Sequence, residues 1–241
     1  MQSGLYVALS GQVALERRLE TIASNVANMN TVGYRADGVS FEAQMAKAGD
    51  ATVAFASGGA GFISRRSGGV TKTGNPLDVA VQGEGWLAVK TPAGTVYTRD
   101  GRMTIQESGQ LTTLTGYPVL DAGGAPILLD ASAGPPDIAN DGMISQKGNQ
   151  VGALGLYQID DSAKLTRYNN SGVIPDKPAT AILDFSSNGI SQGFVEGSNV
   201  NPIMEMTKLI TVTRAFDGIN AATEKSESSL TDAIKTLGSS T

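Results

Sequence analysis

Residues 77–90 have the sequence Leu77-Asp78-Val79-Ala80-Val81-Gln82-Gly83-Glu84-Gly85-Trp86-Leu87-Ala88-Val89-Lys90. The first part of this stretch alternates with the period of two that is typical of a β-strand. A second strand-like run begins at Trp86, directly after the turn-forming residues Gly83-Glu84-Gly85. The stretch therefore predicts two short β-strands that are connected by a hairpin turn.

Short strands and turns continue on the C-terminal side of this stretch. The pair Asp100-Gly101 favours a tight hairpin between two further candidate strands. The candidate strands are Val96–Arg99, Met103–Ile105, Leu111–Leu114, Ile127–Leu129, Val151–Ile159, Leu165–Tyr168 and Ala181–Phe185. Turns at intervals of about 8–12 residues indicate an antiparallel sandwich or barrel. We expect this β domain over residues 70–192.

The N-terminal region has the period of a helix instead. Apolar side chains recur in steps of four and three at Leu15, Leu19, Ile22, Val26 and Met29. This is the a/d spacing of a coiled coil, and it predicts a helix over residues 5–29. The turn-forming residues that follow should end the helix, and Gly33 is available for a left-handed cap.

A second heptad pattern covers residues 199–238. Asn199 or Asn201 is a candidate N-cap, and Pro202 suits the first helical position. The apolar seam positions are Leu209, Val212, Phe216, Ile219, Leu230 and Leu237. Thr223 and Ser226 interrupt this seam with polar side chains. We therefore expect a C-terminal helix whose apolar stripe is weaker in its middle.

These patterns together predict a mainly β fold with terminal helices. The expected parts are an N-terminal helical region over residues 1–36, a connector rich in Gly, Ala and Ser over 37–69, the antiparallel β domain over 70–192, and a C-terminal helical region over 193–241. The connector is expected to be extended or partly helical and to dock on a neighbour. The two helices can form a coiled-coil layer with other subunits, or they can close as an intramolecular hairpin on the β domain. The residues alone leave both arrangements open.

Composition argues against catalysis. The 241 residues include no histidine and no cysteine. The chain therefore lacks the commonest general base and metal ligand, as well as thiolate nucleophiles and disulfides. No cluster of carboxylates stands out in the sequence. We expect no enzyme activity, no cofactor, no metal site and no small-molecule substrate.

Charge and hydropathy exclude other classes of partner. The formal net charge is −5 and there is no basic run, so we expect no nucleic-acid binding. No window approaches 18 apolar residues, so we expect no membrane insertion. The first 15 residues lack the basic region of a secretory signal peptide, and composition alone would therefore place the chain in the cytosol.

Several local patterns favour ordinary loops over binding sites. Gly83-x-Gly85-x-x-Ala88 fits a loose dinucleotide fingerprint, but that site needs a helix after the glycines, and Trp86–Lys90 has the pattern of a strand. Asp160-Asp161 lacks the spacing of an EF-hand. Trp86, the only tryptophan, is expected to anchor the core. A sugar-stacking role for it would fit a rival interpretation, in which the chain is a β-sandwich binding module.

Three separated blocks carry a more specific signal. The first block is Ala23-Ser24-Asn25-Val26-Ala27-Asn28-Met29-Asn30-Thr31-Val32-Gly33-Tyr34. The second block combines Gly74–Trp86 with Tyr97–Gly101 and Leu111–Pro118. The third block is Gly193–Asn201 together with the helix that follows it. In this order the blocks resemble the signatures of flagellar rod and hook proteins. The residues that carry the N-terminal motif are Asn25, Asn28, Thr31, Gly33 and Tyr34.

The resemblance implies a structural subunit of the bacterial flagellar basal-body rod. Its helices would polymerise with copies of itself and with other rod subunits in a helical assembly, and the rod would transmit torque from the motor to the hook. The chain length and the short connector favour a proximal-rod subunit, with a distal-rod subunit as the alternative. The family is exported through the flagellar type III apparatus without signal cleavage, which implies the periplasmic section of the rod.

Overall fold

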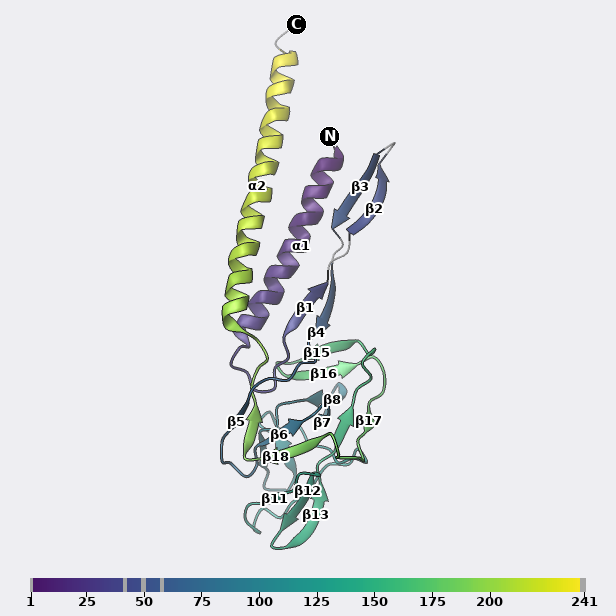
Figure 1. The fold of residues 1–241 in the computed structure, drawn as a ribbon, viewed down its shortest axis with the longest axis vertical. Coiled ribbons are helices and arrows are strands. Elements are labelled where there is room, and N and C mark those ends of the chain that lie inside the picture. Colours follow the sequence, from purple (N-terminus) through teal and green to yellow (C-terminus); the bar gives the residue numbers. More distant parts are fainter. Residues whose placement is uncertain (1, 41–42, 49–50, 57–58, 239–241) are drawn as a thin grey trace. The chain divides into compact units, whose positions relative to one another are not determined.

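The computed structural model describes residues 2–40, 43–48, 51–56 and 59–238 (Figure 1). The chain divides into two compact units. We call the first the helical unit, which comprises Met1–Ala27, Asp37–Phe62 and Asn201–Thr241. The second is the β unit, which comprises Asn28–Ala36 and Ile63–Val200.

The helical unit contains two long helices and a β-ribbon. Helix α1 spans Gln2–Ala27 and helix α2 spans Pro202–Gly238, and the two helices run side by side (Figure 1). The expected connector forms four strands: β1 (Asp37–Ser40) pairs with β4 (Ala60–Ile63), and β2 (Ala43–Ala48) pairs with β3 (Ala51–Ala56). β1 and β3 lie against α1. This part of the chain therefore belongs to an ordered ribbon beside the first helix.

The β unit is built from antiparallel sheets. Its largest sheet has the strand order β15-β16-β8-β7-β14-β17. These strands are β15 (Leu165–Tyr168), β16 (Gly172–Pro175), β8 (Gly94–Thr98), β7 (Trp86–Thr91), β14 (Leu156–Gln158) and β17 (Thr180–Ala181). The neighbouring small sheets pair β5 (Val70–Lys72) with β19 (Phe194–Glu196), β6 (Val79–Gln82) with β18 (Gly189–Gln192), β9 (Met103–Ile105) with β10 (Leu111–Thr113), and β12 (Met143–Gln146) with both β11 (Asp137–Ile138) and β13 (Asn149–Ala153). The mainly β, antiparallel class with two terminal helices is confirmed.

The central strand β7 is covered by apolar side chains on both of its faces. Leu87 and Val89 belong to one core cluster, and Trp86 and Ala88 belong to a second one. All four side chains are buried. A strand that is buried on both faces has a continuous apolar run instead of clean alternation, and Trp86–Val89 is such a run.

Two of the predicted hairpins are wrong. β6 pairs with β18 and not with β7, so Gly83-Glu84-Gly85 is a turn between strands of different sheets. The side-chain oxygen of Asn188 accepts hydrogen bonds from the amides of Glu84 and Gly85 and holds this turn. β8 and β9 are likewise unpaired with each other, and a Cβ at Gly101 would lie 1.9 Å from the carbonyl oxygen of Val79. Glycine is needed at position 101 for this close approach of two backbone segments, a reason that is invisible in a local pattern.

The helix ends differ from the sequence prediction in detail. α1 ends at Ala27, so Gly33 lies beyond the position of a helix cap, although its φ of +69° is left-handed. α2 begins at Pro202, and the side-chain oxygen of Asn201 accepts a hydrogen bond from the amide of Met204 at 3.2 Å. Of the two candidate N-caps, Asn201 therefore caps the helix.

Candidate functional site

The paired helices are the first candidate surface. Gln12 of α1 donates a hydrogen bond to Asn220 of α2 at 2.8 Å, and Asn25 lies within 3.4 Å of Glu205. These two contacts show that the helices are antiparallel. α2 has 37 residues and α1 has 26, and α2 continues past the first turn of α1 (Figure 1). The last turns of α2 therefore extend beyond the helix with which it pairs.

The structure places the predicted seam residues unequally. Ile22 and Val212 are buried, with 2% of each side chain exposed. The half-buried members are Leu15, Val26, Met29, Leu209 and Ile219, and the exposed members are Leu19 and Phe216. Leu230 and Leu237 lie in α2, but their side chains are outside the described part of the chain. The seam residues Ile22 and Val212 are thus buried within the chain, whereas Leu19 and Phe216 are exposed to solvent.

Further apolar side chains on both helices are exposed. Leu9 and Val13 of α1 are exposed by 53% and 40%. The first turns of α2 expose Ile203, Met204, Met206 and Ile210, with Ile203 at 77%. The heptad seam does not include these six residues. Large apolar side chains that are exposed close together in one element, as the four at the start of α2 are, are typical of interaction sites.

Asn25 is a polar hub within the helical unit. Its amide group makes two hydrogen bonds with the backbone of Asp37, one donated at 2.9 Å and one accepted at 2.8 Å. It also donates to the carboxylate of Glu205, which accepts from Lys208 as well. Asn25 and Glu205 are both buried. Asn25 therefore joins α1 to the backbone of β1, 12 residues further along the chain.

The rest of the N-terminal motif lies in the β unit. Asn28 and Thr31 form a local turn, in which the hydroxyl of Thr31 donates to the side chain of Asn28. A Cβ at Gly33 would lie 2.2 Å from the amide nitrogen of Asp100, so this position tolerates only glycine. Tyr34 is completely buried, and the guanidinium of Arg167 lies 4.4 Å from its ring centroid. The motif therefore docks the segment after α1 onto the β unit.

Next to this motif, Glu196 forms a buried charge cluster with two arginines. Its Oε1 atom lies 2.8 Å from Nη2 of Arg35, and its Oε2 atom accepts a hydrogen bond from Nη1 of Arg99 at 3.0 Å. Both guanidiniums lie over the ring of Trp86, at 5.4 Å and 5.3 Å from its centroid. We call these four residues the Glu196 cluster. It contains two positive charges and one negative charge, and all four side chains are buried.

Burial disfavours the charged form of both arginines. It lowers the pKa of Arg35 to about 10, against the opposing attraction of Glu196. It also lowers the pKa of Arg99, again opposed by Glu196. The cluster was not predicted from the sequence, because Arg35, Arg99 and Glu196 are far apart in the chain. The available signal was their position in the family-like blocks, since Arg99 and Glu196 lie within two of the blocks and Arg35 directly follows another.

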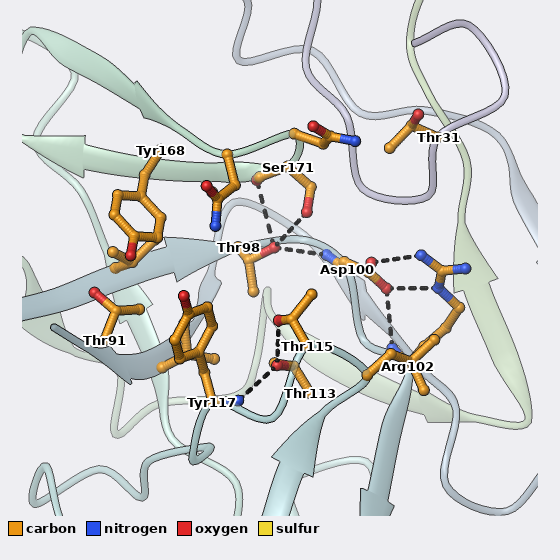
Figure 2. A pocket seen from close by; sticks show the side chains of 16 residues that line it. Thr31, Thr91, Thr98, Asp100, Arg102, Thr113, Thr115, Tyr117, Tyr168 and Ser171 are labelled. Atoms are coloured by element: carbon orange, nitrogen blue, oxygen red, sulfur yellow. Dashed lines mark hydrogen bonds and ion pairs between the residues drawn. The ribbon is translucent and has the colours of Figure 1, made fainter. Parts of the chain in front are cut away.

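A pocket of about 380 Å³ lies in the β unit (Figure 2). Hydroxyl side chains line much of it, together with the edge-to-face pair Tyr117 and Tyr168. Its two charged residues, Asp100 and Arg102, form an ion pair at 2.7 Å. Hydroxyl groups that line the pocket also form hydrogen bonds within the protein. The hydroxyl of Thr98, for example, donates a hydrogen bond to the carbonyl oxygen of Ser171. The pocket therefore presents no uncompensated charge that would select a ligand.

Within the described residues, no group of three or more acidic side chains could hold a metal ion. None of the described helices is both long enough and apolar enough to cross a membrane. The structural features that remain are paired helices with exposed apolar faces and a β unit that anchors the segments next to them. These features are typical of a structural protein.

Comparison with known proteins specifies the class further. Three family models match: flagella basal body rod protein over residues 5–35, flagellar hook protein FlgE/F/G D1 domain over 80–146, and flagellar basal body rod FlgEFG protein C-terminal over 191–224. The flagellar basal-body rod protein FlgF of Mesorhizobium japonicum is 54% identical, with 99% of both chains covered. FlgF of Rhizobium meliloti is 49% identical over the full length of both chains, and the basal-body rod protein FlgG of Bacillus subtilis is 30% identical, with 90% of this chain and 92% of its own covered.

The chain belongs to the FlgF family of flagellar basal-body rod proteins. It is a structural subunit of the flagellar rod and is located in the flagellar basal body. FlgG proteins are more distant relatives.

Proposed function

We propose that the subunit polymerises into the rod through the exposed apolar faces of α1 and α2. The observation that carries this proposal is the exposure, among the described residues, of eight large apolar side chains on two helices that already pair with each other. These residues are Leu9, Val13, Leu19, Ile203, Met204, Met206, Ile210 and Phe216. Burying such a surface against neighbouring subunits is favourable by roughly 25 cal/mol per Å².

The predicted seam residues take part in this assembly in two ways. Buried positions such as Ile22 and Val212 hold the two helices together. Exposed positions such as Leu19 and Phe216 contact other subunits. The coiled-coil layer would then be completed by copies of this chain and by other rod subunits. The role is mechanical and non-catalytic, with no nucleic acid, no small-molecule substrate and no direct membrane insertion.

We place the subunit in the proximal, periplasmic part of the rod. This placement is supported by the identities of 54% and 49% to FlgF proteins, against 30% to a FlgG protein. Export through the flagellar type III apparatus without a cleaved signal peptide fits this location. Closely packed helix contacts in such a rod would resist twisting, because protein interiors have low compressibility, and would transmit torque from the motor to the hook.

A cysteine introduced by Arg18→Cys tests the assembly. Arg18 is exposed on α1, and the native chain contains no cysteine, so every adduct reports this position. In intact cells we expect thiol cross-links between this chain and other rod subunits. A second cysteine variant, Gln150→Cys in the exposed part of β13, measures cross-linking outside the helices.

Two charge substitutions sharpen this experiment. Leu19→Asp changes an exposed side chain and should abolish the cross-links while the helices stay paired. Ile22→Asp changes a buried one and should also reduce the helical circular dichroism signal of the purified chain. Normal cross-linking and normal swimming with Leu19→Asp would show that the exposed face is not the assembly surface.

A further inference from the structure

The carboxylate of Glu196 binds more than its two arginines. Its Oε1 atom accepts a hydrogen bond from the amide of Gly68 at 2.8 Å, and its main-chain carbonyl accepts one from the amide of Gly33 at 2.7 Å. Arg35 also donates to the carbonyls of Arg65 and Arg66. Glu196 therefore joins its own segment, residues 196–200, to two segments of the β unit that are distant in the sequence, residues 28–36 and 63–68. These make three segments in all.

These three segments are the ones that continue into the helical unit. Residues 28–36 follow α1 and lead into β1, residues 63–68 follow β4, and residues 196–200 lead into α2. Asn199 joins the same segments a few residues further on. Its side-chain oxygen accepts from the amide of Ala36 at 2.6 Å, and its side-chain nitrogen donates to Ser64 and to the carbonyl of Arg66.

The cluster is poorly suited to stabilising the fold. Two buried cations share a single carboxylate, and the Nε atoms of Arg35 and Arg99 have no hydrogen-bond partner among the residues that the structure describes. Desolvation of buried charges often cancels their mutual attraction, so a buried ion pair is weak evidence for stability. Charge-assisted hydrogen bonds do impose a specific geometry, and a guanidinium fixes the direction of its partners.

We propose that Glu196 is a positioning residue for rod assembly. It holds the segment that follows α1 and the segment that precedes α2 at a fixed spacing in the β unit, and the helices need this spacing to enter the assembly together. The inference rests on the proposed polymerisation through the helices. It adds that assembly depends on a carboxylate that lies outside the helices.

The double variant Arg35→Met, Glu196→Gln separates positioning from folding. Glu196→Gln alone would leave two buried arginines without a carboxylate and is expected to impair folding. The double variant removes one positive and one negative charge, so the cluster keeps its original net charge of one positive unit. The remaining guanidinium, Arg99, still donates to the carbonyls of Val81 and Gly83. Arg102→Met is the matched control, since it removes a partly exposed arginine–carboxylate pair from the same unit.

Amide hydrogen exchange on the purified chain is the first measurement. In the double variant we expect at least tenfold faster exchange at Gly33, Ala36 and Gly68, whose amides bind Glu196 or Asn199. Exchange in β7 and β8 should stay within twofold of the native chain. Equal acceleration throughout β7 and β8 would mean that the cluster merely stabilises the fold, and the proposal would be overturned.

The second measurement is made in cells that carry the double variant together with Arg18→Cys. We expect cross-links to rod subunits to fall at least tenfold, and to remain normal with Arg102→Met. Normal cross-linking despite faster exchange at Gly33 and Ala36 would also overturn the positioning role. Absence of cross-links in the otherwise native chain would instead refute the helix assembly itself, so the two failures are distinguishable.

Discussion

The β unit and the helical unit bury their side chains in different ways. In the β unit, two apolar clusters cover both faces of the central strand β7. In the helical unit, the buried side chains among those described are Ile22, Asn25, Glu205 and Val212, of which two are polar. Long helices obtain most of their stability by packing an apolar stripe against neighbouring elements. Two helices that pack mainly on each other bury little apolar surface. From this comparison we predict that the β unit is stable alone, and that the helical unit gains further apolar contacts only in the proposed assembly.

A cavity in the core of the β unit should give the largest loss of stability. Leu156 is fully buried in the cluster that contains Leu87. The substitution Leu156→Ala removes packed methyl groups and leaves a void. It should therefore lower the free energy of unfolding of the β unit by about 3 kcal/mol. Urea unfolding followed by the fluorescence of Trp86, the only tryptophan, reports this unit. Leu183→Ala is the control, since that side chain is 84% exposed and its loss should cost less than 0.5 kcal/mol. Equal shifts in the two variants would contradict the two-sided core.

Removing a buried polar side chain from the helical unit should cause an intermediate loss of stability. Asn25→Ala removes the two hydrogen bonds between the side chain of Asn25 and the backbone of Asp37, which should cost about 1–2 kcal/mol. The loss should appear in thermal unfolding followed by circular dichroism at 222 nm, with little change in Trp86 fluorescence. Thr21→Ala provides the comparison, because the hydroxyl of Thr21 bonds only one turn back to the carbonyl of Arg17. If the fluorescence transition shifts as much as the helical one, the units are more tightly coupled than their separate cores suggest.

The sequence predicted the features that depend on neighbouring residues. Heptad spacing identified both helices, and alternation with turn residues identified the antiparallel β region. The predicted hairpins at Gly83–Gly85 and Asp100-Gly101 were wrong. β6 pairs with β18, which lies far away in the chain, and β8 pairs with β7 and with the distant strand β16 instead of β9. The Glu196 cluster was missed for the same reason. Its carboxylate lies 161 positions after Arg35, and no local pattern links the two.

The smallest effect distinguishes two asparagines that the sequence left as equal candidates for one cap. Asn201→Ala removes the N-cap of α2 and should destabilise the helical unit by about 1 kcal/mol. Asn199→Ala removes bonds to Ala36, Ser64 and Arg66, all in the β unit, and should shift the Trp86 fluorescence transition instead. Both variants replace an asparagine by alanine, and the two positions are only two residues apart. The effects of the substitution on composition and on the chain entropy of the unfolded state are therefore the same in both variants. Identical unfolding profiles by fluorescence and circular dichroism would mean that the boundary between the units does not lie between these two residues.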